Sequence, residues 1–322
     1  MTAPKAQEMT VKQIKQQVAS MSKSTANDAG IPQFWLTDWL LYVLAKPSAF
    51  LIMEENYQLT GSEFEQFTAG VAEMQQGVPL AYLTGQQEFW SLDFKVNEHT
   101  LIPRPDTEIL VEQVLHWIMA QSDSMNPQSD VVTSVANKRL LDLGTGSGCI
   151  AISLAHELAQ SRAAMANTSN AKVEVVTSSW QVVAVDFSAA ALEVARHNAV
   201  VNKITNIEFV QSSWYSELST DTRQLFDVIV SNPPYIDEAD EHLVGLLAEP
   251  ISALSARNHG LADIEHIVEQ APQYLRAGGL LAIEHGFDQG AAVRQLFIDN
   301  GFKHAKTVQD FGGNDRVTFG QL

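Results

Sequence analysis

The sequence predicts an α/β fold in which a doubly wound, mainly parallel sheet follows a small helical domain. From residue 140 onward, short apolar segments alternate with helical ones, which is the pattern of a parallel sheet with helices on both faces. Residues 1–80 instead show helical periodicity. The chain has 322 residues, 45% apolar and 18% charged, which is enough for one large and one smaller domain with sizeable cores.

The first 80 residues are expected to form a bundle of helices. Apolar side chains recur at helical spacing around residues 34–43. The apolar stretch 39–53 is interrupted by Lys46 and Pro47, so it predicts two helix segments and is too short to cross a bilayer. Ser62 and Glu65 have the spacing of a capping box at the start of another helix. The first thirty residues are polar, and no signal peptide is expected.

Residues 81–105 are expected to form a β-hairpin that links the two domains. Gly85 is followed by the aromatic residues Phe89, Trp90 and Phe94, a pattern typical of paired strands. The second domain, 106–322, is expected to begin with an amphipathic helix over 107–119, and the polar segment 121–137 is expected to be a loop.

The strands and helices of the second domain follow one another along the chain. Strands are expected over 140–143, 182–185, 207–210, 228–230 and 280–283, and helices over 150–158, 189–199, 264–275 and 290–299. The segment 306–321 has strand character around 317–319 and is expected to finish the sheet as an antiparallel edge. Because crossovers in such sheets are right-handed, ligands are expected at the carboxyl ends of the strands.

A glycine-rich turn lies between the first of these strands and its helix. Its residues are Gly144, Thr145, Gly146, Ser147 and Gly148. The glycines permit a tight turn that approaches a ligand closely, at the positive end of the next helix. Dehydrogenases use similar turns, but two features differ here. Asp142 precedes the turn and the spacing is GxGxG, which suits a ligand with a positively charged amino-acid group better than a pyrophosphate.

The second strand ends at Asp186, a position from which a carboxylate can bind both hydroxyls of a ribose. The alternative role is to cap the next helix, for which Ser188 is the better residue. Asp186 follows Gly144 at about twice the roughly 20-residue spacing of a usual unit. The excess, 160–180, is rich in small and polar residues and is interpreted as a surface insertion. Trp214, after the third strand, suits stacking on an adenine or packing in the core.

The tetrapeptide Asn232-Pro233-Pro234-Tyr235 ends a buried strand in a rigid turn. By residue frequencies it would occur by chance in such a chain on the order of once in a thousand. An amide nitrogen is a poor nucleophile because its lone pair is delocalised into the carbonyl. Acceptors on Asn232 and the Pro233 carbonyl, held in place by the two prolines, would orient such a nitrogen toward a methyl group. Tyr235 could cover the planar target with its ring. The turn therefore predicts methyl transfer from a sulfonium to an amide or amine.

These motifs together resemble the PrmC/HemK family of glutamine methyltransferases, which modify class 1 peptide-chain release factors. The resemblance covers nearly the whole chain. It rests on Tyr82-Leu-Thr-Gly85, Glu88-Phe-Trp90, the stretch Leu101-Ile-Pro-Arg-Pro-Asp-Thr-Glu108, the glycine turn, Ser231-Asn-Pro-Pro-Tyr-Ile-Asp237, Glu284-His-Gly286 and Asn314-Asp-Arg-Val317. The Ile-Pro-Arg-Pro-Asp-Thr-Glu stretch is specific, because the sister family that modifies a ribosomal protein differs there.

The resemblance implies a helical N-terminal domain that recognises the substrate, followed by a seven-stranded class I methyltransferase (Rossmann-like) domain. It implies S-adenosylmethionine as cofactor, no metal, and the glutamine of a Gly-Gly-Gln loop as methyl acceptor. Cofactor-binding residues are then expected at Gly144–Gly148, Asp186, Phe187, Ser213, Trp214 and Asn232. Asn232, Pro233 and Tyr235 are expected to be catalytic, and the substrate is expected to contact Asn232–Tyr235, Phe89 and Arg104.

The chain departs from the family pattern at three places. Ser213 stands where an acidic residue often precedes the tryptophan, so the adenine amine is expected to be bound differently. The segment 243–250 is short and lacks an arginine expected before Glu249-Pro250. The insertion over 160–180 is also unusual.

Three alternatives remain open from sequence. Asn-Pro-Pro-Tyr also suits an exocyclic amine of a flipped base, as in DNA adenine methyltransferases. A formal charge of −18 without basic clusters disfavours a nucleic-acid partner, although it also serves simply to keep a protein in solution. The others are a glutamine methyltransferase for a ribosomal protein and a silent scaffold. The single cysteine, Cys149, excludes a disulfide framework and fits the cytoplasm.

Overall fold

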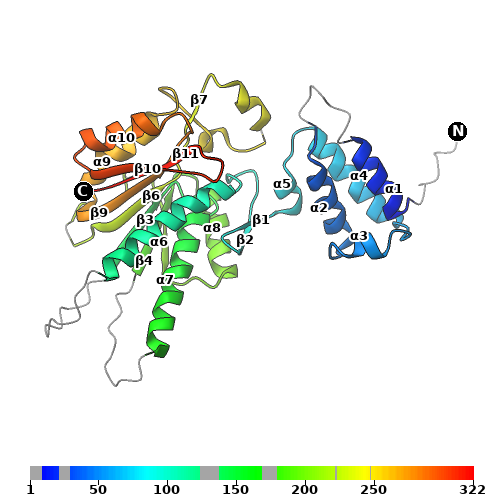
Figure 1. Cartoon of the computed structure of the whole chain (residues 1–322), viewed down its shortest axis with the longest axis horizontal. Coiled ribbons are helices and arrows are strands. Elements are labelled where there is room, and N and C mark those ends of the chain that lie inside the picture. Colours follow the sequence, from blue (N-terminus) through cyan, green and yellow to red (C-terminus); the bar gives the residue numbers. More distant parts are fainter. Residues whose placement is uncertain (1–8, 22–29, 124–137, 169–179, 222, 247) are drawn as a thin grey trace. The chain divides into compact units, whose positions relative to one another are not determined.

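The computed structural model describes residues 9–21, 30–123, 138–168, 180–221, 223–246 and 248–322 (Figure 1). The chain divides into two compact units, Met1–Gly85 and Gln86–Leu322. Most of the loop expected over 121–137, and residues 169–179 of the expected insertion, lie outside the described residues.

The first unit is helical, as predicted. Its helices are α1 (Val11–Met21), α2 (Gln33–Leu44), α3 (Phe50–Met53), α4 (Gly61–Gln75) and α5 (Leu80–Thr84). Trp39 lies in its core, where the indole Nε1 donates a hydrogen bond to the Phe67 carbonyl at 3.0 Å and the ring packs directly against Gly70. Helix α2 ends before Lys46-Pro47 and helix α3 begins after it, which confirms the two predicted segments.

The capping box of α4 lies two residues earlier than predicted. Thr60, not Ser62, is the N-cap: its side chain accepts a hydrogen bond from the Glu63 amide at 3.2 Å. The Glu63 carboxylate accepts in return from the Thr60 amide at 2.7 Å. The sequence contains both spacings, and the Ser62–Glu65 interpretation was wrong because Ser62 is already inside the helix.

A hairpin is present within the segment 81–105, but it covers only residues 86–95 and is part of the second unit. Residues 81–84, expected to belong to the hairpin linker, lie in α5 of the first unit. The hairpin strands β1 (Gln86–Phe89) and β2 (Leu92–Lys95) pair in antiparallel fashion around Trp90 and Ser91. Both turn residues have left-handed backbone conformations, with φ of 54° and 57°. Asn198, on a helix described below, fixes the hairpin by accepting from the Lys95 amide at 2.8 Å and donating to the Lys95 carbonyl at 3.0 Å.

The second unit is built on one seven-stranded sheet. Its strands are β3 (Lys138–Leu143), β4 (Trp180–Asp186), β5 (Ile207–Gln211), β6 (Phe226–Ser231), β9 (Leu275–Glu284), β10 (Lys303–Gln309) and β11 (Asp315–Gln321). The order across the sheet is β10-β11-β9-β6-β3-β4-β5. The pairs that include β11 are antiparallel, and the other neighbouring pairs are parallel. This confirms the predicted doubly wound fold. The edge was mispredicted, however, because β10 forms it and β11 lies inside the sheet.

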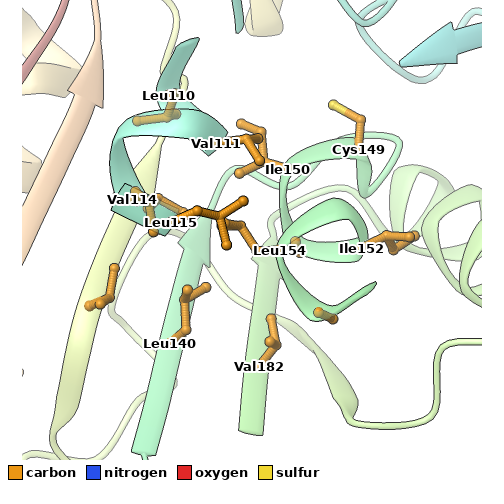
Figure 2. Packing of buried hydrophobic residues seen from close by; sticks show 14 of the residues in the cluster. Leu110, Val111, Val114, Leu115, Leu140, Cys149, Ile150, Ile152, Leu154 and Val182 are labelled. Carbon is orange, nitrogen blue, oxygen red and sulfur yellow. The ribbon is translucent and has the colours of Figure 1, made fainter. Parts of the chain in front are cut away.

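Helices cover both faces of this sheet. They are α6 (Glu108–Asp123), α7 (Cys149–Thr168), α8 (Ala189–Val201), α9 (Ala262–Gln270) and α10 (Gly290–Asp299). Leu110 and Val114 of α6 and Ile150 and Leu154 of α7 pack with Leu140 of the sheet (Figure 2). Side chains of α9 and α10 pack against the other face, where alternate strand residues point.

The two largest differences from the predicted helix boundaries are at the C-terminal ends of α9 and α7. The helix expected over 264–275 ends at Gln270, and a 3₁₀ turn, η4 (Ala271–Gln273), follows it. Pro272 lies in that turn, and proline is disfavoured inside a helix because it lacks an N–H. The expected insertion over 160–180 is in part an extension of α7, which runs to Thr168, and its last residue, Trp180, begins β4.

Shorter elements complete the carboxyl edge of the sheet. They are η1 (Pro105–Thr107), β7 (Ile236–Asp237), η2 (Glu241–Leu246), η3 (Ile251–Ala253) and β8 (Ser255–Ala256), with β7 and β8 paired in parallel. Within the described ranges, no helix is both long and apolar enough to cross a membrane.

Candidate active site

A cavity of about 450 Å³ lies at the carboxyl ends of β3, β4, β5 and β6, within the second unit. Most of the residues predicted from sequence line it: Arg104, Gly144, Thr145, Gly146, Ser147, Asp186, Phe187, Ser213, Trp214, Asn232 and Pro234. Four others do not: Phe89, Gly148, Pro233 and Tyr235. The cavity therefore lies at the carboxyl ends of the strands, where the alternation of strands and helices predicted a ligand site.

The glycine turn forms one wall of the cavity. Gly144, Gly146 and Gly148 all have positive φ, at 72°, 55° and 84°. A Cβ on Gly144 would lie 3.3 Å from the indole of Trp214, so the missing side chain admits that ring. The amides of Gly144 and Thr145 both donate to the Val185 carbonyl at 2.9 Å, which ties the turn to β4.

Asp142 does not face the cavity, contrary to the role expected for it. Its side chain is fully buried beneath the turn, where Oδ2 accepts from the Thr145 hydroxyl at 2.7 Å. Burial raises the pKa of this carboxyl to about 7. Asp142 therefore supports the conformation of the turn. It does not line the cavity, so it is not placed to contact a ligand's ammonium group.

Asp186 lines the cavity at the end of β4 and is itself held in place. Its Oδ2 accepts from the Gly146 amide at 2.9 Å, and its Oδ1 accepts from the Ser188 amide at 2.9 Å. Ser188 is the N-cap of α8, accepting from the Ala191 amide at 3.2 Å. The alternative in which Asp186 caps the helix is therefore wrong. Each carboxylate oxygen of Asp186 also has a second lone pair, which can accept a hydrogen bond from a ligand's hydroxyl in the cavity.

Trp214 faces the cavity with a strained backbone. Its φ is 50°, an uncommon value for a bulky residue, and the Ser212 hydroxyl donates to its carbonyl at 2.8 Å. Asp263, from the first turn of α9, also lines the cavity, and burial raises the pKa of its carboxyl while the Trp214 side chain lowers it. An indole beside a carboxylate is suited to an aromatic ring that carries an amine.

Asn232 lies at the end of β6 and lines the cavity. Its Nδ2 donates a hydrogen bond at 3.2 Å to the hydroxyl of Thr107, which is buried and also lines the cavity. Thr107 belongs to the Ile-Pro-Arg-Pro-Asp-Thr-Glu stretch, so two motifs far apart in sequence meet here.

Tyr235 is tied away from the cavity by two contacts. Its hydroxyl donates to Oε1 of Glu284 at 3.2 Å, and burial raises the pKa of this phenol well above its usual value. Its carbonyl accepts from Gln289 Nε2 at 3.0 Å. Glu284 is 1% exposed, and burial raises its pKa to about 7. Tyr235 therefore does not line the cavity, which differs from the covering position expected from sequence.

The two remaining substrate candidates differ from each other. Arg104 lines the cavity and forms an ion pair with Glu249, whose other oxygen accepts from the Ile102 amide at 3.0 Å. Phe89 is 1% exposed and packs edge-on against Phe94 in the core. Phe89 therefore stabilises the hairpin and does not reach the cavity.

The residues of this region that were not assigned from sequence include Thr107, Asp263 and Glu284. Thr107 of η1 and Asp263 of α9 line the cavity, and Glu284, at the end of β9, contacts Tyr235. Thr107 and Glu284 lie inside motifs that were noted, and Glu284 ends a strand next to β6, which is a usable signal. Asp263 looks like an ordinary acidic residue in a first helical turn. In the part of the chain that the structure describes, no group of three or more His, Cys, Asp or Glu side chains could hold a metal.

Comparison with known proteins gives two family matches. Residues 134–311 match the family described as "Methyltransferase domain", and residues 27–85 match the family described as "PrmC N-terminal domain". Among solved structures, the catalytic domain of hMettl16 matches with a TM-score of 0.50 at 14% identity, covering 84% of this chain and 94% of that one. That likeness concerns the fold alone.

Curated relatives extend over nearly the whole chain. Proteins named "Release factor glutamine methyltransferase" are 40% identical in Shewanella oneidensis, covering 95% of this chain and 92% of that protein, and 41% identical in Vibrio cholerae, covering 94% and 91%. The relative of that name in Escherichia coli is 40% identical, covering 88% and 89%. With these relatives, both family matches and a methyltransferase-type sheet carrying Asn-Pro-Pro-Tyr at its carboxyl edge, the chain belongs to the release factor glutamine methyltransferase family.

Proposed function

We propose that this enzyme transfers a methyl group from S-adenosylmethionine to the side-chain amide nitrogen of the glutamine in the Gly-Gly-Gln loop of class 1 peptide-chain release factors, in the cytoplasm. The name shared by the relatives supports the substrate. The chemistry of the cavity supports the reaction, because an amide side chain and a glycine turn lie at the same edge of one sheet.

The cavity fits this cofactor in three respects. The glycine turn leaves room for a ligand to lie against the backbone, since a Cβ on Gly146 would have nothing within 4 Å. Asp186 has acceptor capacity for ribose hydroxyls, and Trp214 with Asp263 suits an adenine and its amine. When bound, S-adenosylmethionine supplies an electrophilic methyl group. Phe187 and Ser213 line the same wall and would complete the cofactor pocket.

The protein's own residues would orient the acceptor amide. A primary amide has two N–H donors, and the oxygen of Asn232 and the carbonyl of Pro233 are acceptors that can take one each. Prolines at 233 and 234 restrict the backbone, so these acceptors are positioned before the substrate arrives. Arg104 and Pro234, also at the cavity, would contact the substrate loop, and Tyr235 would support the turn through Glu284.

The observation that carries this proposal is Asn232, an amide side chain at the cavity with one of its polar ends already bonded to Thr107. The test is transfer of labelled methyl from S-adenosylmethionine to a purified class 1 release factor. Label is expected on the intact factor and none on a factor whose loop glutamine is replaced by alanine. Ribosomal protein and adenine-containing DNA serve as further acceptors in the same assay.

Asn232→Ala is expected to lower turnover by about 100-fold or more, because the acceptor is no longer oriented, while binding of the cofactor survives in part. A matched control is Asn300→Ala, at the end of α10, which is expected to leave turnover unchanged. Unaltered turnover in Asn232→Ala would contradict the role assigned to this side chain. Label on DNA or ribosomal protein, but not on the release factor, would contradict the proposed substrate.

A further inference from the structure

We propose that Thr107 and Glu284 are positioning residues that fix which end of the Asn232 amide faces the substrate. In this arrangement Nδ2 of Asn232 is held by Thr107, and Oδ1 is left to accept a hydrogen bond from the acceptor amide. The inference rests on the proposed function for the nature of the substrate, but the arrangement itself can be tested without any substrate.

The orientation of Asn232 matters because the two ends of its side chain are nearly the same shape and opposite in function. The oxygen accepts hydrogen bonds and the NH₂ group donates them. A half-turn about the last bond would present NH₂ to the NH₂ of the substrate glutamine, and two donors repel each other. Something must therefore distinguish the two orientations before the substrate binds.

Thr107 can make this distinction only if its hydroxyl acts as an acceptor toward Asn232. The hydroxyl oxygen lies 3.2 Å from Asn232 Nδ2, and the residue is 2% exposed. A hydroxyl has one proton and two lone pairs. If its proton is donated to another acceptor, the hydroxyl can only accept a hydrogen bond from Asn232. Without a second partner, the same hydroxyl could donate to Oδ1 and stabilise the wrong orientation.

Glu284 supplies that second partner. It is buried, its Oε1 accepts from the Tyr235 hydroxyl at 3.2 Å, and its Oε2 has no hydrogen-bond partner in the described part of the chain. Above about pH 7, where Glu284 is ionised, its carboxylate has no proton to give, so a nearby hydroxyl must donate to it. Asn232 and Glu284 follow paired residues of adjacent strands, so we assign Oε2 of Glu284 as the acceptor for the Thr107 hydroxyl, which Asn232 already contacts. The same hydroxyl lowers the pKa of Glu284 against the effect of burial. In the proposed arrangement, the proton of Thr107 is directed to Glu284 and its lone pair to Asn232.

The fold brings the three side chains together. Ser231 of β6 and Ile283 of β9 are paired in parallel register, so Asn232 and Glu284 follow at the same level of two adjacent strands. Thr107 ends η1, which comes from the stretch before α6. Arg316 holds this stretch through ion pairs. Its Nη2 lies 3.7 Å from Oδ2 of Asp106 and 3.0 Å from Oδ2 of Asp310.

Tyr235 makes the last hydrogen bond of the arrangement. Its hydroxyl donates to Oε1 of Glu284 at 3.2 Å. The positive charge of Arg316 lowers the pKa of this phenol against the effect of burial. In the proposed arrangement, donation therefore runs from Tyr235 to Glu284, and from Asn232 to Thr107 to Glu284.

The first test compares Thr107→Val with Thr107→Ser in the full-length enzyme, with methyl transfer to a release factor at about pH 8.5, above the raised pKa of Glu284. Valine has nearly the shape of threonine but cannot accept, and serine can. Thr107→Val is expected to lower kcat by about 10- to 100-fold while KM for the cofactor stays within about twofold, and Thr107→Ser is expected to restore most of kcat.

Glu284→Gln tests the direction of the hydrogen bonds with almost no change in shape. Because Tyr235 donates to residue 284, the new side chain is expected to turn its oxygen to Tyr235 and its NH₂ to Thr107. Thr107 then accepts from residue 284 and sends its proton to Asn232, which favours the wrong orientation. Its kcat is expected to fall by about 10-fold or more, again with little change in KM for the cofactor.

A substrate-free readout separates this inference from the proposed function. In protein labelled with ¹⁵N-asparagine, the Asn232 side-chain signal is identified by its loss in Asn232→Ala. One of its two amide hydrogens is expected to exchange slowly in the wild type and in Thr107→Ser, and rapidly in Thr107→Val and Glu284→Gln.

The possible outcomes distinguish the proposed arrangement of side chains from the proposed substrate. Slow exchange that is lost in both variants supports the arrangement even if no release factor is methylated, and then only the substrate is wrong. A methylating enzyme whose kcat is unchanged in Thr107→Val overturns the inference and leaves the proposed function standing. Equal losses of kcat, cofactor affinity and thermal stability in the valine and serine variants would also overturn it, because they indicate a structural role only.

Discussion

The three glycines of the glycine turn share a left-handed backbone but differ in what surrounds them. A Cβ on Gly144 would meet the Trp214 indole at 3.3 Å, whereas a Cβ on Gly148 would meet Ile152 at 2.8 Å and Ala195 at 3.2 Å. A Cβ on Gly146 would meet open space. One glycine therefore admits an aromatic ring, another allows α7 and α8 to approach, and the third leaves room for a ligand.

Gly144→Ala is expected to weaken cofactor binding more than it destabilises the fold. The added methyl displaces the Trp214 ring, and the left-handed backbone adds about 1–2 kcal/mol of strain. The matched control is Gly301→Ala, which has a φ of 84° and open space around its Cβ, so it carries the strain alone. Calorimetry should give a weaker cofactor affinity for Gly144→Ala only. Equal affinities in the two variants would contradict the role of the Trp214 contact.

The buried carboxyl of Glu284 is expected to make stability depend on pH. Burial raises its pKa from the ordinary 4.5 to about 7, so between these values the folded protein keeps a proton that the unfolded chain has lost. Its contribution to stability is therefore fully present below about pH 4.5 and declines as pH rises, by up to about 3 kcal/mol once pH passes 7.

The measurement is the difference in unfolding free energy between wild type and Glu284→Gln, by urea denaturation from about pH 4.5 to 8.5. The wild type should lose stability relative to the variant up to about pH 7.5, and the difference should then level off. Glu269→Gln, on the exposed side of α9, controls for the change in net charge. A difference that is constant over the whole range would show that Glu284 does not titrate in this window.

Residues were predictable from sequence where a rare pattern coincided with a strand end. Asp186, Trp214 and Asn232 were identified in this way, and all three line the cavity. Thr107 and Glu284 were not, because their significance depends on a hydrogen-bonded arrangement between segments more than a hundred residues apart. Asp142 was assigned to the ligand because strand periodicity does not say which side of a tight turn a carboxylate takes.

At the scale of secondary-structure elements, the hairpin turn is the feature that departs most from local preference. Trp90 and Ser91 both have positive φ, the conformation of a two-residue type I′ turn, which usually contains asparagine and glycine. Three carboxylates offset the strain: Glu108 accepts from the Trp90 amide at 2.7 Å, Glu157 from its indole at 3.0 Å, and Glu88 from the Ser91 amide at 2.9 Å.

Ser91→Gly is expected to stabilise the second unit by about 0.5–1 kcal/mol. Glycine adopts a left-handed conformation without the steric cost, Ser91 is exposed, and the hydrogen bond from its backbone amide is kept. The measurement is the unfolding free energy in urea, with Ser62→Gly in α4 as the opposite case, since glycine inside a helix is destabilising. A loss of stability in Ser91→Gly would mean that the serine side chain makes a contribution larger than the strain.

Element boundaries were less predictable than element types, for local physical reasons. The Thr60 and Ser62 capping patterns overlap, and the choice between them depends on where the preceding chain enters the helix. Strand β10 was missed because it alternates basic and polar residues with few apolar ones, as an edge strand can. The strand forms because it pairs with β11, and this pairing cannot be predicted from the sequence of β10 alone.

At the scale of the whole molecule, the division of the chain at Gly85 separates two sets of properties. Every residue that lines the cavity belongs to the second unit, and the helical unit has a hydrophobic core of its own. The match of residues 27–85 to a family distinct from the methyltransferase match indicates that the helical unit is a module in its own right. Its expected task is recognition of the release factor.

A chain that begins at Gln86 is therefore expected to bind the cofactor with the affinity of the full-length enzyme, within about twofold, because the cavity is complete without the helical unit. Methylation of an intact release factor should fall mainly through a higher KM, since contacts that hold the protein substrate would be lost while the orientation of the glutamine by Asn232 would remain. Calorimetry with the cofactor and steady-state kinetics with the release factor measure the two effects separately. An unchanged KM for the release factor would contradict a role of the helical unit in substrate recognition. A large loss of cofactor affinity in a folded truncated chain would contradict the assignment of the cofactor site to the second unit alone.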